Sequence, residues 1–147
     1  MKQRVFLAED LTRMRGLLVD LFSSTGEFQV VGTACTEAEA ESWLARHGDE
    51  WDLAIIDLVL DEGNGTNVVR RARQSHYGGV VAVLASCVTE NLREHCYALG
   101  ADSVFDEAET GRFLLWLGKV GAGLPAAPGS GVRVRPGTRA YRRGRGA

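Results

Sequence analysis

Five short apolar runs alternate with five amphipathic segments along residues 1–121, and this alternation constrains the fold more than any other feature of the chain. Each run has the length of a buried strand, and the amphipathic segments carry apolar residues at helical spacing. Strand–helix repeats with short links favour parallel strands, right-handed crossovers and helices on both faces of one sheet. We therefore expect an α/β fold built on a five-stranded parallel, doubly wound sheet. The expected strands are Val5–Ala8, Phe28–Cys35, Trp51–Asp57, Val80–Ala85 and Ser103–Phe105.

The expected helices have recognisable ends. Apolar residues recur at helical spacing over Leu11–Phe22. Thr36 followed by Glu39 matches a capping box, and Thr89 is placed to cap a later helix that stops at Gly100. Another helix should follow the turn Gly63-Asn64-Gly65, and the last one should turn Phe113, Leu114, Leu117 and Val120 towards the core.

The composition changes after residue 121. Residues 1–121 hold all 19 acidic residues and 11 of the 17 basic ones, a net charge of −8, whereas residues 122–147 hold six arginines and no acid. All three prolines also lie in this last stretch, which offers too little apolar area to offset the entropy of ordering. We expect one folded domain over 1–121 and a disordered Gly/Pro/Arg-rich basic tail over 122–147. A passive extension is favoured for the tail, with a weak polyanion contact or attraction back to the acidic body as alternatives.

The cysteines and the hydropathy indicate the cellular compartment of the protein. Cys35, Cys87 and Cys96 are odd in number and form no C-x-x-C motif, which favours free thiols in a reducing environment. Only four apolar residues follow the basic start before Glu9, too few for a signal peptide, and no segment is long enough to span a membrane. We expect a cytoplasmic protein without membrane insertion.

Carboxylates follow two of the expected strands. Glu9-Asp10 comes directly after Val5–Ala8, and Asp57 lies in the apolar run Leu53–Leu60. A buried charge costs several kcal/mol unless something pairs with it, so such residues favour a shared site. In a doubly wound sheet the binding crevice lies beyond the carboxyl ends of the strands. We therefore expect Glu9-Asp10, Asp57 and Ser86, which ends the fourth strand, to meet there.

Five segments form a recognisable series along the chain. They are Val5-Phe6-Leu7-Ala8-Glu9-Asp10, Ile55-Ile56-Asp57-Leu58, Gly63-Asn64-Gly65, Val83-Leu84-Ala85-Ser86 and Gly100-Ala101-Asp102. Together they resemble the receiver (CheY-like) domain of two-component response regulators, and the resemblance covers Arg4 to about Val120. It implies a flavodoxin-like sheet with the strand order 2-1-3-4-5.

The resemblance also implies a chemistry. Asp57 would accept a phosphoryl group from a phosphohistidine on a histidine kinase or histidine phosphotransfer protein. Asp10, Asp57 and the main-chain carbonyl of Val59 would bind Mg²⁺, and Glu9 would bind it through water. A small hard cation prefers oxygen ligands and offsets charge on a transferring phosphoryl group. Ser86 takes the place of the family's switch hydroxyl.

Three positions depart from the family pattern. Glu107 stands where the family has a lysine that pairs first with the acceptor and then with its phosphoryl group. A glutamate repels the acceptor and its phosphoryl group instead of attracting them. At ~5 Å and an effective dielectric of about 20, the repulsion between two such charges is roughly 3 kcal/mol. Val104 stands where a switch aromatic is common, with Phe105 on the opposite face of the strand, and Asp61 stands where a proline is common.

Four functions compete. The leading one is a stand-alone receiver that is not an enzyme beyond its own phosphorylation and dephosphorylation. It would signal through protein binding on the face of its fourth helix, fifth strand and fifth helix, the face through which receivers often form homodimers. Glu107 motivates a pseudo-receiver that binds partners without phosphorylation. A hydrolase with an Asp57 nucleophile is disfavoured because Val59 stands where an acid/base carboxylate would be needed. A tail that tethers nucleic acid is the fourth, and only weak contact through its arginines is expected.

Overall fold

The structure is a computed structural model that describes residues 2–9, 18–22 and 26–122. Its centre is a sheet of five parallel strands in the order β2-β1-β3-β4-β5, which confirms the fold expected from the sequence. The strands are β1 (Gln3–Ala8), β2 (Phe28–Ala34), β3 (Leu53–Asp57), β4 (Val80–Ala85) and β5 (Ser103–Asp106).

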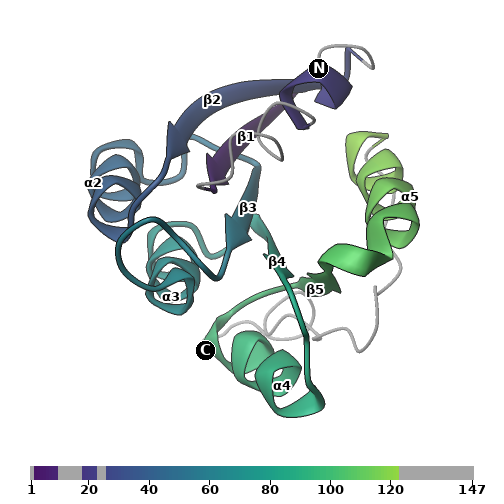
Figure 1. Cartoon of the computed structure of the whole chain (residues 1–147). Coiled ribbons are helices and arrows are strands. Elements are labelled where there is room, and N and C mark those ends of the chain that lie inside the picture. The colour runs from purple at the N-terminus through teal and green to yellow at the C-terminus, as the bar shows by residue number, and fades with distance from the viewer. Residues whose placement is uncertain (1, 10–17, 23–25, 123–147) are drawn as a thin grey trace.

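Helices cover both faces of the sheet. Figure 1 shows α2, α3 and α4 on one side of the strands and α5 on the other. Residues 18–22 are helical, whereas the rest of the helix expected over Leu11–Phe22, and the tail from residue 123 onward, lie outside the described residues. No described helix is long and apolar enough to cross a membrane. The helices are α2 (Glu37–His47), α3 (Gly65–Ser75), α4 (Glu90–Leu99) and α5 (Thr110–Gly121), with a short 3-10 helix η1 (Glu107–Glu109) before α5.

The expected helix caps are confirmed. The Thr36 side chain accepts the Glu39 N–H at 3.1 Å, whereas Glu39 Oε1 accepts the Cys35 N–H at 2.8 Å, one residue before the N–H that a capping box would use. Thr89 Oγ1 accepts the Leu92 N–H at 3.1 Å at the start of α4. These bonds satisfy backbone donors that the first turn of a helix leaves without an internal partner.

Strand side chains alternate between two apolar clusters, one on each face of the sheet. The cluster under α2, α3 and α4 contains the strand residues Phe6, Ala8, Ala54, Ile56, Val81, Val83 and Val104. The cluster under α5 and residues 18–22, called here the α5-side cluster, contains Val5, Leu7, Leu53, Ile55, Ala82, Leu84 and Phe105.

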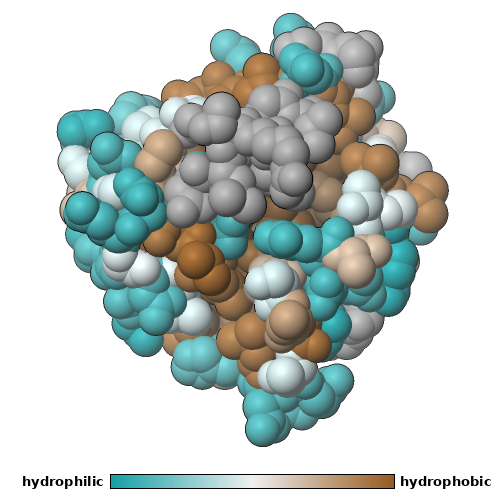
Figure 2. Space-filling view, viewed as in Figure 1, coloured by the Kyte–Doolittle hydropathy of each residue, from teal (hydrophilic) through white to brown (hydrophobic). Residues whose placement is uncertain are grey.

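The expected inward position of Leu114 is wrong, because this residue is 43% exposed, whereas Trp116 is only 5% exposed. Phe113, Trp116, Leu117 and Val120 form the inward stripe of α5, and Trp116 packs beside Phe105 with ring centroids 5.6 Å apart. Because Leu114 points outward, hydrophobic surface remains over α5 (Figure 2).

The third strand begins later than expected. Trp51 is fully buried but precedes β3, and its Nε1 donates to the Gly48 carbonyl at 2.9 Å.

Candidate functional site

The pairing of β1 with β3 places two carboxylates on neighbouring strands. Ala8, the last residue of β1, pairs with Ile56, and the next residues along these two neighbouring strands are Glu9 and Asp57. Both side chains are buried, with 1% of Glu9 and 4% of Asp57 exposed. Adjacent buried carboxylates are costly without a compensating positive charge, so this pair favours a cation.

Four residues expected at the site lie at the carboxyl ends of four neighbouring strands. They are Glu9 after β1, Asp57 as the last residue of β3, Ser86 after β4 and Glu107 after β5. Side chains along a strand alternate, so Asp57 points to the same side as Ile55, the side of the α5-side cluster. Glu107 lies on that side too, because it lines a pocket together with Leu84 and Phe113.

The metal-ligand set expected from the sequence is only partly described. Asp10 lies outside the described residues, and no group of three His, Cys, Asp or Glu suited to a metal occurs among the residues that the structure does describe. Within that part of the chain, Glu9 and Asp57 supply two neighbouring buried carboxylates. Carboxylate oxygens are ligands that Mg²⁺ prefers, so the donor chemistry fits this ion.

The loop after β3 fixes the orientation of Asp57. Asp57 Oδ1 accepts the Val59 N–H at 3.0 Å, and Gly65 N donates to the Leu58 carbonyl at 3.0 Å. A Cβ on Gly65 would overlap the Asp57 carbonyl oxygen and lie 2.6 Å from Leu58 Cα. Because α3 starts directly against the backbone of Asp57, only glycine fits at position 65.

Ser86 lies at the end of β4 as expected, with an exposed side chain. Cys87 follows with a positive φ of 56°, an unusual conformation for a residue with a side chain. The next residue, Val88, donates its N–H to Asp106 Oδ2 at 3.0 Å. The loop that carries Ser86 is therefore tied to the end of β5.

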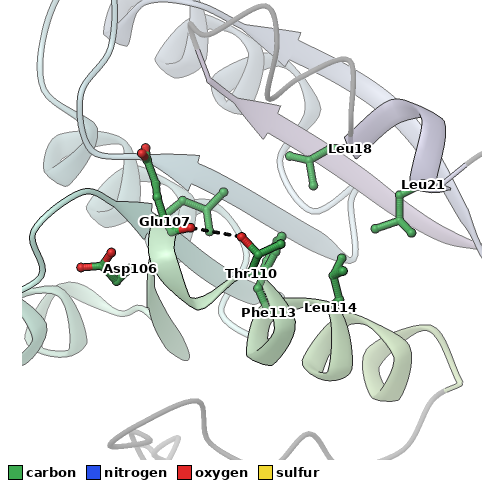
Figure 3. Close-up of a pocket in the computed structure, with 8 residues that line it drawn as sticks. Leu18, Leu21, Asp106, Glu107, Thr110, Phe113 and Leu114 are labelled. Atoms are coloured by element: carbon green, nitrogen blue, oxygen red, sulfur yellow. Dashed lines mark hydrogen bonds between the residues drawn. The ribbon is translucent and has the colours of Figure 1, made fainter.

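Glu107 opens η1, and its backbone carbonyl accepts the Thr110 hydroxyl at 3.1 Å. Figure 3 shows its side chain directed away from Thr110, beside an apolar pocket of about 270 Å³. The pocket lies between residues 18–22 and the start of α5, on the α5 side of the sheet. Its lining residues are Leu18, Leu21, Leu84, Asp106, Glu107, Thr110, Phe113 and Leu114.

A family model described as the response regulator receiver domain matches residues 5–107. The chain belongs to this family. Receiver domains act in two-component systems, where they interact with histidine kinases and phosphotransfer proteins. They typically bind Mg²⁺, and they are generally not enzymes apart from autodephosphorylation. No curated protein matches the chain.

Solved structures share this fold at low sequence identity. A LuxR-family two-component response regulator from an Aurantimonas species is 18% identical over 86% of this chain and 90% of its own, with a TM-score of 0.72. CheY of Borrelia burgdorferi, crystallised with CheX, BeF3 and Mg, is 19% identical over 80% and 88%, also at 0.72. A Burkholderia pseudomallei response regulator with a phosphorylated aspartic acid, a calcium ion and citrate is 16% identical over 78% and 65%, at 0.68.

The position where receivers often carry an aromatic has a different arrangement here. Val104 is fully buried, and its carbonyl accepts Arg93 NH1 at 2.8 Å. Arg93 is itself only 9% exposed, so α4 is bound to β5 through a buried charge-assisted hydrogen bond. Burial raises the pKa of Tyr97, while the hydrogen bond and the charge of Arg93 act in the opposite direction.

Sequence reasoning missed two carboxylates near the receiver site. Asp106 caps η1 by accepting the Ala108 N–H at 2.9 Å and also holds Val88, while Glu37 at the start of α2 contacts the loop after β3. Asp106 carries a local signal, because Glu109 three residues later completes a capping box. Glu37 carries none, since its partners lie 27 and 30 residues away.

Asp106 should add stability only while its carboxyl is ionised. The N–H groups of Ala108 and Val88 hold the pKa of Asp106 below its ordinary value of 3.8. A lowered folded-state pKa gives stability that is present above pH 3.8 and is lost as the pH falls through the folded-state value. We expect the difference in urea midpoint between wild type and Asp106→Asn to be largest near neutral pH and to shrink below pH 3.8. A difference that is constant over this range would contradict the assignment.

Proposed function

We propose that this receiver accepts a phosphoryl group on Asp57 from a histidine kinase or phosphotransfer protein and signals through protein–protein binding. The observation that carries the proposal is the pair of neighbouring buried carboxylates, Glu9 and Asp57, at the carboxyl ends of β1 and β3. Asp57 is also oriented by the Val59 N–H at 3.0 Å. A held carboxylate requires less reorganisation to react.

The step is a displacement at phosphorus. A carboxylate oxygen of Asp57 forms the new P–O bond as the P–N bond to the donor imidazole breaks, and the imidazole nitrogen keeps the electron pair. Glu9, Asp10, Asp57 and the Val59 carbonyl would hold Mg²⁺, which offsets the charge on the transferring group. The Val59 N–H keeps Asp57 directed into the site, and the exposed Ser86 hydroxyl is placed to bond a phosphoryl oxygen afterwards.

Asp57→Asn should abolish phosphorylation, because an amide is a poor nucleophile and carries no charge for Mg²⁺. Wild type and variant are incubated with Mg²⁺ and acetyl phosphate, and intact mass is recorded. Asp61→Asn is the matched control, since Asp61 is exposed in the same loop. Equal phosphorylation of wild type and Asp57→Asn, or none in the wild type, would refute the proposal.

The second candidate is a binding module that does not depend on phosphorylation. Glu107 favours it, because a carboxylate follows the end of β5 on the side of the sheet to which Asp57 points. In this candidate the site holds a cation constitutively, and partner recognition is independent of Asp57 chemistry. A wild type that binds Mg²⁺ but gains no phosphoryl group from acetyl phosphate would favour this candidate over the first.

A further inference from the structure

Two glutamates in the first turn of α2 have different partners. Glu39 completes the helix cap, since its Oε1 accepts the Cys35 N–H at 2.8 Å. Glu37 instead reaches a distant part of the chain: Oε1 accepts the Asn64 N–H at 2.8 Å, and Oε2 accepts Asn67 Nδ2 at 3.1 Å. The two residues thus form a natural pair for comparing a helix cap with a long-range contact.

The loop that Glu37 holds is the one that orients Asp57. Asn64 forms a bridge with Val59, whose N–H donates to Asp57 Oδ1 at 3.0 Å. Asn64 also caps α3 by accepting the Thr66 N–H at 2.9 Å. A continuous series of contacts therefore runs from Glu37 through Asn64 and Val59 to Asp57.

The contact between Glu37 and the loop after β3 is closely packed and involves a charged carboxylate. Gly63 has a φ of 95°, and a Cβ there would overlap Glu37 Cβ, so the loop packs closely against the start of α2. The backbone bond from Asn64 is the main reason that the pKa of the Glu37 carboxyl is lowered. Hydrogen bonds to an ionised acceptor are stronger than neutral ones. The Glu37 N–H adds a further bond, to the Glu62 carbonyl at 2.8 Å.

We propose that Glu37 is a positioning residue for phosphorylation of Asp57: by holding Asn64 and Asn67, its carboxylate keeps the loop from Leu58 to Asn64 in the conformation that orients Asp57 and the Val59 carbonyl. The inference rests on the proposed function of Asp57. It adds that α2, which contributes no residue to the acidic site, sets the geometry of that site.

The test compares Glu37→Ala with Glu39→Ala in the full chain. Each variant removes one acid from the first turn of α2, so the change in charge at the helix N-terminus is matched, and Glu39→Ala additionally loses the bond at the cap. We expect Glu37→Ala to raise the half-saturating Mg²⁺ concentration and to lower the phosphorylation rate with acetyl phosphate by about tenfold, the effect of losing charge-assisted hydrogen bonds. Glu39→Ala should change each by less than about twofold. Equal effects of the two variants would overturn the proposal.

A second measurement does not require phosphorylation. Amide hydrogen exchange of Val59 and Asn64 should accelerate in Glu37→Ala and remain as in wild type in Glu39→Ala, because the Glu37 side chain bonds Asn64 directly whereas the Glu39 side chain bonds Cys35. If the wild type takes up no phosphoryl group, the proposed function fails while this exchange still decides whether Glu37 holds the loop. Unchanged exchange of both amides in Glu37→Ala would refute the role of Glu37.

Discussion

Replacing Glu107 with lysine is expected to raise the phosphorylated fraction of the protein by tenfold or more at a fixed acetyl phosphate concentration, and to lengthen its lifetime. Asp57 pairs with Leu84, which pairs with Phe105, so β5 lies two strand spacings, about 9.6 Å, from the acceptor. Glu107 opens η1 directly after β5 and lines a pocket with Leu84 and Phe113, on the side of the sheet to which Asp57 points. A carboxylate there repels a phosphorylated Asp57, and an ammonium attracts it.

The size of the effect follows from Coulomb's law. At ~9 Å and an effective dielectric of about 20, one pair of unit charges interacts with about 2 kcal/mol. Charge reversal at position 107 changes the sign of this energy, and the partial exposure of Glu107 reduces it through solvent screening. A net gain of about 1.4 kcal/mol corresponds to tenfold.

The control for this variant is Glu94→Lys, which changes the net charge equally on an exposed position of α4. Intact mass during loading and after removal of acetyl phosphate gives the phosphorylated fraction and its lifetime. Equal values for wild type and Glu107→Lys would place the Glu107 carboxylate outside the influence of Asp57. A gain shared by Glu94→Lys would indicate a general charge effect instead.

The fold was predictable because its signals are local. Apolar runs, helical spacing and caps such as Thr36 and Thr89 depend on residues a few positions apart, and the structure has all five strands in the expected order. Leu114 was misassigned because it is apolar and lies three residues before Leu117, a spacing that also fits an inward stripe. In the structure Trp116 packs beside Phe105 on the inward face, and Leu114 is exposed.

The candidate site was predictable where it depends on strand ends, and not where it depends on pairing between distant segments. Glu9 and Asp57 follow apolar runs, and parallel register brings them together. Glu37 and its partner Asn64 are 27 residues apart, and either one alone resembles an ordinary residue at the start of a helix. Whether Glu107 acts on Asp57 stays a prediction, since the sequence gives its position but not its protonation or its partners.

Gly65→Ala should lower both the stability of the protein and the phosphorylation of Asp57. Its Cβ would overlap the Asp57 carbonyl oxygen and lie 2.6 Å from Leu58 Cα, and both neighbours are backbone atoms that cannot rotate away. Overpacking of this kind costs about 1–3 kcal/mol. The strain also falls on Leu58, whose carbonyl accepts the Gly65 N–H, so we expect a loss of phosphorylation of at least about tenfold.

Gly118→Ala is the matched control, because Gly118 lies in the exposed interior of α5 with nothing within 4 Å of an added Cβ. Alanine there should stabilise the protein by about 0.5–1 kcal/mol, since glycine is the poorer helix former. Urea denaturation gives both stability changes, and acetyl phosphate loading of the folded variants gives the activity. A Gly65→Ala protein as stable and as readily phosphorylated as Gly118→Ala would mean that α3 can withdraw from the backbone of Asp57 at no cost, and the close packing would then not be what holds the acceptor in place.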